Sequence, residues 1–424
     1  MKSSTSAVVI VAAVVGTSVA AMGQLTERPL AGALAHPAIG YYTRPAHDPI
    51  AELNRRVQDG DARIPFDETT GYLRPVLDAL HVPIESQMLV MSKTGVQALY
   101  TGPANPRAIF FNDAVTIGYI RGAPLLEITV QDPQQGVVFY TVEQKAQPRP
   151  TFERRPACLS CHQNYSTLHV PGLLARSVFM APDGLPLGQF GSYDADDRTP
   201  FRRRWGGWYV TGADRSIGHI GNAVVTDREK REAVVSDSTL HRISMDDVFD
   251  GGGYVSAHSD IAALMVFGHQ AHMTNLITRL GWEARMAAYD HRGELARAPL
   301  RDAVTELVDY LLFVDEQSLP AAIKGSSGFA ETFGAQGPAD RRGRSLRQLD
   351  LDRHLMRYPC SYMVYSEAFR ALPADARNAV YVRMWDILSG RDIGPKYGRL
   401  SEGDRRAVMD ILRETLHDLP ADLM

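Results

Sequence analysis

Two cysteines and a histidine lie within one short segment, "ACLSCHQ", as Cys158, Cys161 and His162. Two thiols separated by two residues can each add to one vinyl group of the same porphyrin, and the histidine that follows offers a ring nitrogen to the iron. This CxxCH pattern predicts one covalent haem c, with thioether bonds at Cys158 and Cys161 and with His162 as an axial ligand of the haem iron. A backbone carbonyl near Pro171 is expected to orient the other ring nitrogen of His162.

Three other interpretations compete for the CxxCH segment. A redox-active dithiol leaves His162 unexplained, and the surrounding sequence lacks the βαβ pattern of thioredoxin-like domains. A zinc site would need two further ligands, and although His169 lies nearby, no second CxxC or HxxxH pair accompanies it. A chance match is disfavoured because cysteines are few and an export signal is present. The third cysteine, Cys360, is interpreted as a buried thiol that packs like a small apolar residue. A reactive or iron-ligating thiol is the alternative interpretation.

The second axial ligand of the iron decides between classes of haem protein. A protein ligand such as His or Met suits an electron carrier, whereas an open position admits gas or peroxide. The best candidate is His269, which shares an apolar helical face with Met265 and Met273. A hydrogen-bonded core histidine is the alternative interpretation of His269. Further candidates for the ligand are His258, His272, His219 and Met180.

Arginines and tryptophans gather in the segment "FRRRWGGWYVTG". Arg202, Arg203 and Arg204 could pair with haem propionates, and Trp205 and Trp208 could cover a porphyrin face. A solvated basic edge beside two packed tryptophans explains the same residues equally well. Such an edge could also dock an acidic redox partner.

The N-terminus is typical of a secretory signal. Lys2 precedes a short apolar run, 7–15, and small residues follow in "GTSVAAMGQ", so cleavage is expected near 20–23. The apolar run is too short to span a bilayer, and no later segment is long enough. We therefore expect a periplasmic or otherwise extracytoplasmic protein with no integral membrane segment after cleavage. Its net charge of -4 gives no overall attraction to nucleic acid.

Elements of two kinds must position these residues. Short runs rich in β-branched and aromatic residues predict antiparallel strands in "QMLVMS", "AIFFND", "TIGYIRG", "LLEITVQD" and "GVVFYTVEQ". Helical spacing dominates after Asp227, most clearly in 258–289, 300–317, 373–390 and 401–420. The expected fold class is α+β, an antiparallel sheet region carrying the haem motif followed by a mainly helical C-terminal half.

The expected division of the chain follows these changes in pattern. It comprises a signal peptide at 1–23, an irregular or helical segment at 24–87, a sheet-rich haem c region at 88–226, a helical region at 227–323, a linker at 324–344 and a C-terminal helical unit at 345–424. No internal repeat is visible.

The chain resembles a group of exported bacterial proteins that contain a cytochrome c domain with a single CxxCH motif. The resemblance runs through "SQMLVMSKTGVQ", "PRAIFFND", "ACLSCH", "RWGGWYVTG", "LMVFGHQ" and "YPCSYMVYSEAF". It implies haem c at Cys158, Cys161 and His162 and electron transfer to an unidentified redox partner protein. A haem-dependent, peroxidase-like oxidoreductase and a haem-based sensor with an open axial position are the alternatives, and electron transfer is preferred to catalysis.

Overall fold

The computed structural model describes residues 30, 32–213, 215–227, 229, 233–234, 242–293 and 297–420. The expected signal peptide, 1–23, lies outside this part of the chain. Within the described residues, none of the helices combines the length and the apolar character needed to cross a membrane.

Two short helices, α3 (Pro49–Asp59) and α4 (Leu73–Ala79), precede the sheet in the chain. The Asp48 side chain caps α3 by accepting hydrogen bonds from the backbone N–H groups of Ile50 and Ala51. The buried residues of both helices join a core cluster that includes one face of the sheet. These helices therefore cover that face.

The main sheet has six strands that pair with their neighbours in chain order and are all antiparallel. They are β1 (Met88–Val90), β2 (Arg107–Phe111), β3 (Val115–Tyr119), β4 (Leu125–Asp132), β5 (Gly136–Glu143) and β6 (Glu153–Arg154). The runs predicted as strands form β1 to β5, as their β-branched and aromatic content indicates.

The two faces of this sheet differ in chemistry. Residues alternate along the central strand β4 between buried apolar side chains, such as Ile128, and half-buried ones, such as Glu127. The first set belongs to the face covered by α3 and α4. The second set belongs to what we call the mixed face, which carries Arg107, Ile109, Gly118, Glu127, Thr129, Gln131, Phe139 and Thr141.

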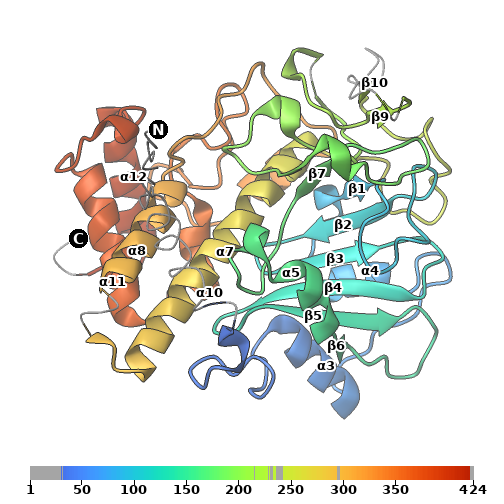
Figure 1. The fold of residues 1–424 in the computed structure, drawn as a ribbon, viewed down its shortest axis with the longest axis horizontal. Helices are drawn as coiled ribbons and strands as arrows, with labels where there is room; N and C mark the ends of the chain where they lie inside the picture. Colours follow the sequence, from blue (N-terminus) through green and yellow to red (C-terminus); the bar gives the residue numbers. More distant parts are fainter. Residues whose placement is uncertain are drawn as a thin grey trace, which may run out of the picture.

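The CxxCH segment follows the sheet directly. It forms η3 (Pro156–Cys158) and α5 (Leu159–His162), and Figure 1 shows α5 lying in front of the sheet near β4 and β5. Beyond it, β7 (Arg176–Val178) pairs with β8 (Ser192–Asp194). In the chain between them, the Gly184 N–H donates to the Ala181 carbonyl in a tight turn, and Gly184 has φ +87°. A further small pair joins β9 (Val224–Val225) to β10 (Ala233–Val234).

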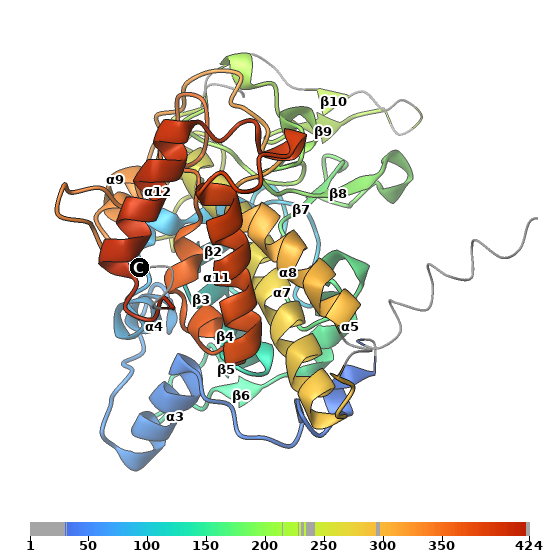
Figure 2. The same cartoon turned by 90° about the vertical axis from the view of Figure 1, so that its left-hand side faces the viewer.

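One long helix, α7 (Ile261–Tyr289), separates the sheet from the C-terminal helices (Figures 1 and 2). Its N-terminal cap is Asp260, whose side chain accepts from the Ala262 N–H, and most of its residues are buried. Trp282 packs in the cluster that contains the sheet, whereas Leu276 packs with the C-terminal helices. The helix thus packs against the sheet through some of its side chains and against the C-terminal helices through others.

The remaining helices are α8 (Arg297–Leu311), α9 (Phe329–Gly334), α10 (Glu367–Arg370), α11 (Ala374–Leu388) and α12 (Glu402–Thr415). The α+β fold class, with an antiparallel sheet first and helices after, is confirmed. The segment expected as a linker, 324–344, contains α9, whose Phe329 and Phe333 are buried. The domain boundaries themselves stay predictions.

Short 3-10 turns complete the description. They are η1 (Ala33–Ala35), η2 (Ile84–Ser86), η4 (Tyr165–Thr167), η5 (Gly188–Phe190), η6 (Phe201–Arg203), η7 (Arg215–Ile217), η9 (Tyr362–Tyr365) and η10 (Pro395–Tyr397).

Candidate functional site

The two cysteines of the motif lie on one helical turn. Pro156 starts η3 because its fixed φ suits a first helical position, and the chain continues into α5 without a break. Cys158 is half-buried, Cys161 is exposed, and neither sulfur is in a disulfide. Residues three positions apart on a helix share a face, so both thiols can be reached by one ligand from one side.

His162 is held by the chain that returns past it. Its Nδ1 lies 3.0 Å from the carbonyl oxygen of Gly172, and the Gly172 N–H donates to the His162 carbonyl at 2.9 Å. A carbonyl can only accept, so Nδ1 carries the proton and Nε2 keeps a free lone pair. The expected orienting carbonyl near Pro171 is confirmed, with Gly172 as the acceptor. This is the tautomer that binds a metal through Nε2.

Neighbouring elements fix Gly172 in turn. Asn275 on α7 donates to the Leu173 carbonyl at 2.8 Å and accepts from the Leu173 N–H at 2.9 Å. The Pro171 carbonyl accepts from the Val137 N–H, at the start of β5, at 3.1 Å. A Cβ on Gly172 would stand only 2.1 Å from Asn275 Oδ1, so glycine is required for this approach.

The surroundings of His162 favour its neutral form. Burial lowers the pKa of the ring, and although the Gly172 carbonyl opposes that effect, Arg107 and Arg176 lower the pKa further. The Phe139 ring of β5 lies 4.9 Å from the imidazole, centre to centre. A neutral imidazole is the form that ligates iron, so the site stabilises the state that the predicted role requires.

Glu127 on β4 influences both ends of the motif. Its charge opposes the lowering of the His162 pKa. Burial raises the pKa of the Cys158 thiol, and Glu127 raises it further. The carboxylate is held by Arg107 at 3.3 Å and by the Gln97 amide at 2.9 Å. The mixed face of the sheet therefore belongs to the same site as the CxxCH turn.

His269, the expected second ligand, has ring contacts with Tyr310 of α8 and Tyr362 of η9. It is fully buried, its Nε2 is 2.7 Å from Ser361 Oγ, and its Nδ1 is 3.6 Å from an Asp197 carboxylate oxygen. Its ring stacks on Phe313 at 4.5 Å between ring centres. None of these partners belongs to the CxxCH segment. Ligation by His269 stays a prediction, and its contacts here are those of a core histidine.

The alternative histidines fall into different settings. His219 accepts from the Gly221 N–H through Nδ1 at 3.0 Å, which leaves its proton on Nε2. His258 Nδ1 faces the Ile243 carbonyl at 2.9 Å, so it has the same tautomer as His162. His272 lines a small cavity together with Ser166 of the chain that follows the motif. This cavity therefore lies between His272 of α7 and the chain that follows the motif.

The two tryptophans and Arg204 of the segment lie in the core, whereas Arg202 and Arg203 are exposed. Trp205 and Trp208 are 2% and 5% exposed, and the Trp208 indole donates to the Arg176 carbonyl at 2.7 Å. Arg204 is buried and donates to the carbonyls of Thr199 and Asp197. Both indoles belong to the apolar core cluster, and their contact with a porphyrin face stays a prediction.

Cys360 is fully buried, and burial raises the pKa of its thiol to about 12. The prediction that Cys360 is a buried thiol is confirmed, and its role stays a prediction. Zinc gains no support, because no three His, Cys, Asp or Glu side chains of the described ranges group as a metal site. A haem iron needs fewer protein ligands, and His162 with its free Nε2 fits that need.

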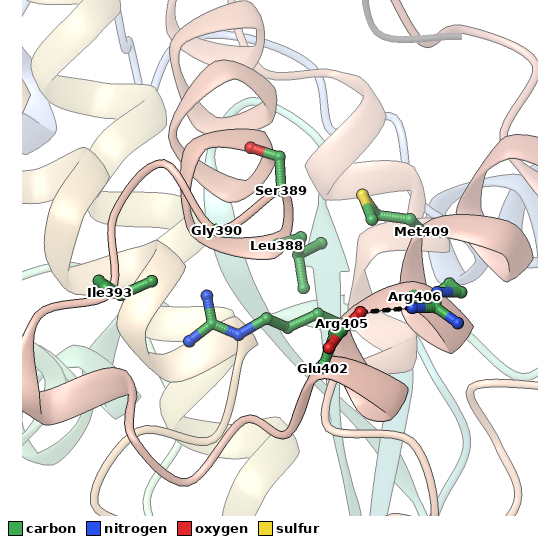
Figure 3. Close-up of a pocket in the computed structure, with 8 residues that line it drawn as sticks. All are labelled: Leu388, Ser389, Gly390, Ile393, Glu402, Arg405, Arg406 and Met409. Atoms are coloured by element: carbon green, nitrogen blue, oxygen red, sulfur yellow. Dashed lines mark hydrogen bonds and ion pairs between the residues drawn. The ribbon is translucent and has the colours of Figure 1, made fainter.

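A separate pocket lies where α11 meets α12 (Figure 3). Its charged side chains are already engaged within the chain: Arg405 donates to the carbonyls of Ile387 and Leu400, and Arg406 pairs with Glu402 at 2.5 Å. Arg405 thereby closes the end of α11, which is a structural role.

Comparison with known proteins gives no match: no protein family, no curated protein and no solved structure is recognisably similar to this chain.

Proposed function

We propose that this chain is an exported c-type haem protein that transfers electrons through one haem bound at Cys158, Cys161 and His162. The observation that carries the proposal is the hydrogen bond between His162 Nδ1 and the Gly172 carbonyl, 3.0 Å long. It leaves Nε2 as a lone-pair donor immediately after two free thiols on one turn. A histidine held in this way has a fixed ring orientation before any metal is present.

The chain's own groups account for the steps of assembly. Each thiol, at Cys158 and Cys161, would add across a vinyl double bond, so that a sulfur–carbon bond forms and the thiol hydrogen moves to the neighbouring carbon. His162 would bind through Nε2 while Gly172 holds its proton at Nδ1. The bound haem would supply a one-electron couple whose potential depends on ligands, burial and nearby charge. Arg107 and Glu127 are charged residues of the sheet that shift the pKa of His162.

Export is part of the proposal. The signal-like residues 1–23 motivate it, and haem c attachment to a thiol pair suits a compartment in which free cysteines do not persist. A redox partner protein is expected there. Fractionation of cells that express the full chain would test export, and accumulation in the cytoplasm without cleavage would contradict it.

Covalent attachment is tested with the full chain expressed alongside a haem c maturation system. Wild type and Cys360→Ala should retain haem after acid–acetone extraction, whereas Cys158→Ala with Cys161→Ala should not. Absence of covalent haem from the wild type would overturn the proposal. Low-spin bands that carbon monoxide leaves unchanged would support electron transfer, and carbon monoxide binding would favour the sensor or peroxidase-like alternative.

A further inference from the structure

A cavity of about 570 Å³ lies between the end of α7, the start of α8 and α11, three helices that Figure 2 shows side by side. The rest of its lining comes from Gly293, between α7 and α8, and from Pro373, which precedes α11. Its volume falls within the range of roughly 300–1,000 Å³ that is usual for small-molecule sites. The cavity is thus built by the C-terminal helices and not by the CxxCH turn.

The walls of this cavity are mainly apolar. They include Leu280 and Ala284 of α7, Val304 of α8 and Ala376 of α11, all of which are buried. Val382 of α11 also lines the cavity and is 46% exposed. Protein interiors are packed with few voids larger than a water molecule, so an open apolar space of this size between three helices is unusual. A ligand with an apolar body would cover these walls.

Positive charge gathers at the start of α8. Arg297 and Arg301 both line the cavity, and both are exposed. A helix N-terminus carries a partial positive charge that acidic residues often compensate, yet the first turn of α8, as the structure describes it, contains no acidic residue. Among the described side chains, Arg301 has no ion-pair partner. This end of the cavity therefore attracts an anion.

The other charged groups of the lining, all on α11, are compensated within the chain. Arg383 is held by Asp392 at 2.6 Å, and Asp386 is paired with Arg391 at 3.3 Å. Asp375 is exposed to solvent and lies in the first turn of α11, where the helix N-terminus stabilises a carboxylate. The uncompensated charge of the lining is thus the cationic one on α8.

We propose that this cavity binds a medium-chain fatty acid, with its carboxylate at Arg301 and its acyl chain against Leu280, Ala284 and Val304. A single apolar chain with one anionic end matches an apolar cavity with one uncompensated cationic end. The site is separate from the proposed haem site, so the two proposals are tested separately.

Binding should depend on the length and the charge of the ligand. Each additional buried methylene should tighten binding roughly fourfold, so decanoate should bind roughly 15-fold more tightly than octanoate. Decyltrimethylammonium has an acyl-like chain of the same length and the opposite charge, so it should bind more weakly than decanoate. Isothermal titration calorimetry of the full-length protein measures all three affinities.

Two variants locate the site, each with a matched control. Arg301→Gln should weaken decanoate binding about fivefold and leave 1-decanol binding unchanged, because only the carboxylate uses the guanidinium. Arg342→Gln removes an arginine whose side chain is 73% exposed elsewhere, and it should change neither. Ala379→Leu, at an exposed lining position of α11, should weaken both ligands. Ala298→Leu, at an exposed position of α8 outside the lining, should weaken neither.

The outcomes are distinct. Decanoate binding that rises with chain length and that both lining variants weaken supports the proposal. Absence of saturable decanoate binding overturns it, as does equal binding of decyltrimethylammonium or binding that neither lining variant changes. Preference for phosphatidylglycerol vesicles over decanoate would indicate a membrane surface and overturn it. In sedimentation experiments, a dimer that Ala379→Leu dissociates would show that a second copy covers the cavity, which also overturns it. None of these readouts depends on haem, so the proposed function stands or falls independently.

Discussion

Gly172 and Asn275 approach so closely that a Cβ on the glycine would lie 2.1 Å from the amide oxygen of the asparagine. This contact brings the chain after the CxxCH turn against α7. It holds the carbonyl that orients His162, because Asn275 binds both backbone groups of Leu173. The orientation of the candidate iron ligand therefore depends on a helix that begins 99 positions further along the sequence than His162.

Gly172→Ala tests this dependence. The methyl group must displace Asn275, so we expect a loss of roughly 1–3 kcal/mol in the free energy of unfolding. In the haem-loaded protein the low-spin spectrum should change, because the histidine loses its fixed orientation. Gly188→Ala is the control, since nothing lies within 4 Å of a Cβ there. Equal stability of the two variants would contradict the prediction.

Features of the fold and site that depend only on residues close in the sequence could be predicted from the sequence. The CxxCH motif and the strands are local, and the alternation in "LLEITVQD" already places Glu127 on the same side as Thr129. That Ile109, Gly118 and Glu127 share the mixed face depends on strand register, which the sequence does not state. The apolar helical face of His269 indicates a haem contact, yet its hydrogen-bond partner Ser361 lies 92 residues away in the sequence.

The three cysteines should differ in reactivity in the haem-free protein. Cys161 is exposed and should react first with a thiol reagent, whereas burial raises the pKa of Cys158 and should slow its reaction. Cys360, with a pKa of about 12, should react only after unfolding. Mass spectrometry of peptides after timed alkylation would show the order. Early labelling of Cys360 would mean that the core around it opens readily.

His219 should make stability depend on pH. Burial lowers its pKa from 6.5 to about 4, so between these values the unfolded chain binds a proton that the folded chain does not. The contribution of neutral His219 to the free energy of unfolding is complete above pH 6.5. It falls by roughly 3 kcal/mol as the pH drops to about 4. His219→Asn keeps an acceptor for the Gly221 N–H and removes the titration. Urea unfolding of the wild type and of His219→Asn should therefore show a difference in the free energy of unfolding that grows toward high pH. A difference that does not change with pH would contradict this prediction.

His269 is expected to stabilise the core. Burial pushes the pKa of Asp197 upward, but His269, Tyr310 and Arg198 together outweigh it and hold that pKa at about 2. Asp197 is therefore ionised at neutral pH, and His269→Leu would leave its carboxylate with less compensation. A loss of about 3–5 kcal/mol in the free energy of unfolding is expected.

Two further measurements separate this structural role from iron ligation. Adding Asp197→Asn to His269→Leu should recover part of the lost stability, because the buried charge is then gone. The absorption spectrum of the haem-loaded His269→Leu protein should keep its low-spin bands, because the contacts of His269 are with Ser361, Asp197 and Phe313. Conversion to high-spin bands, with stability little changed, would instead identify His269 as the second axial ligand.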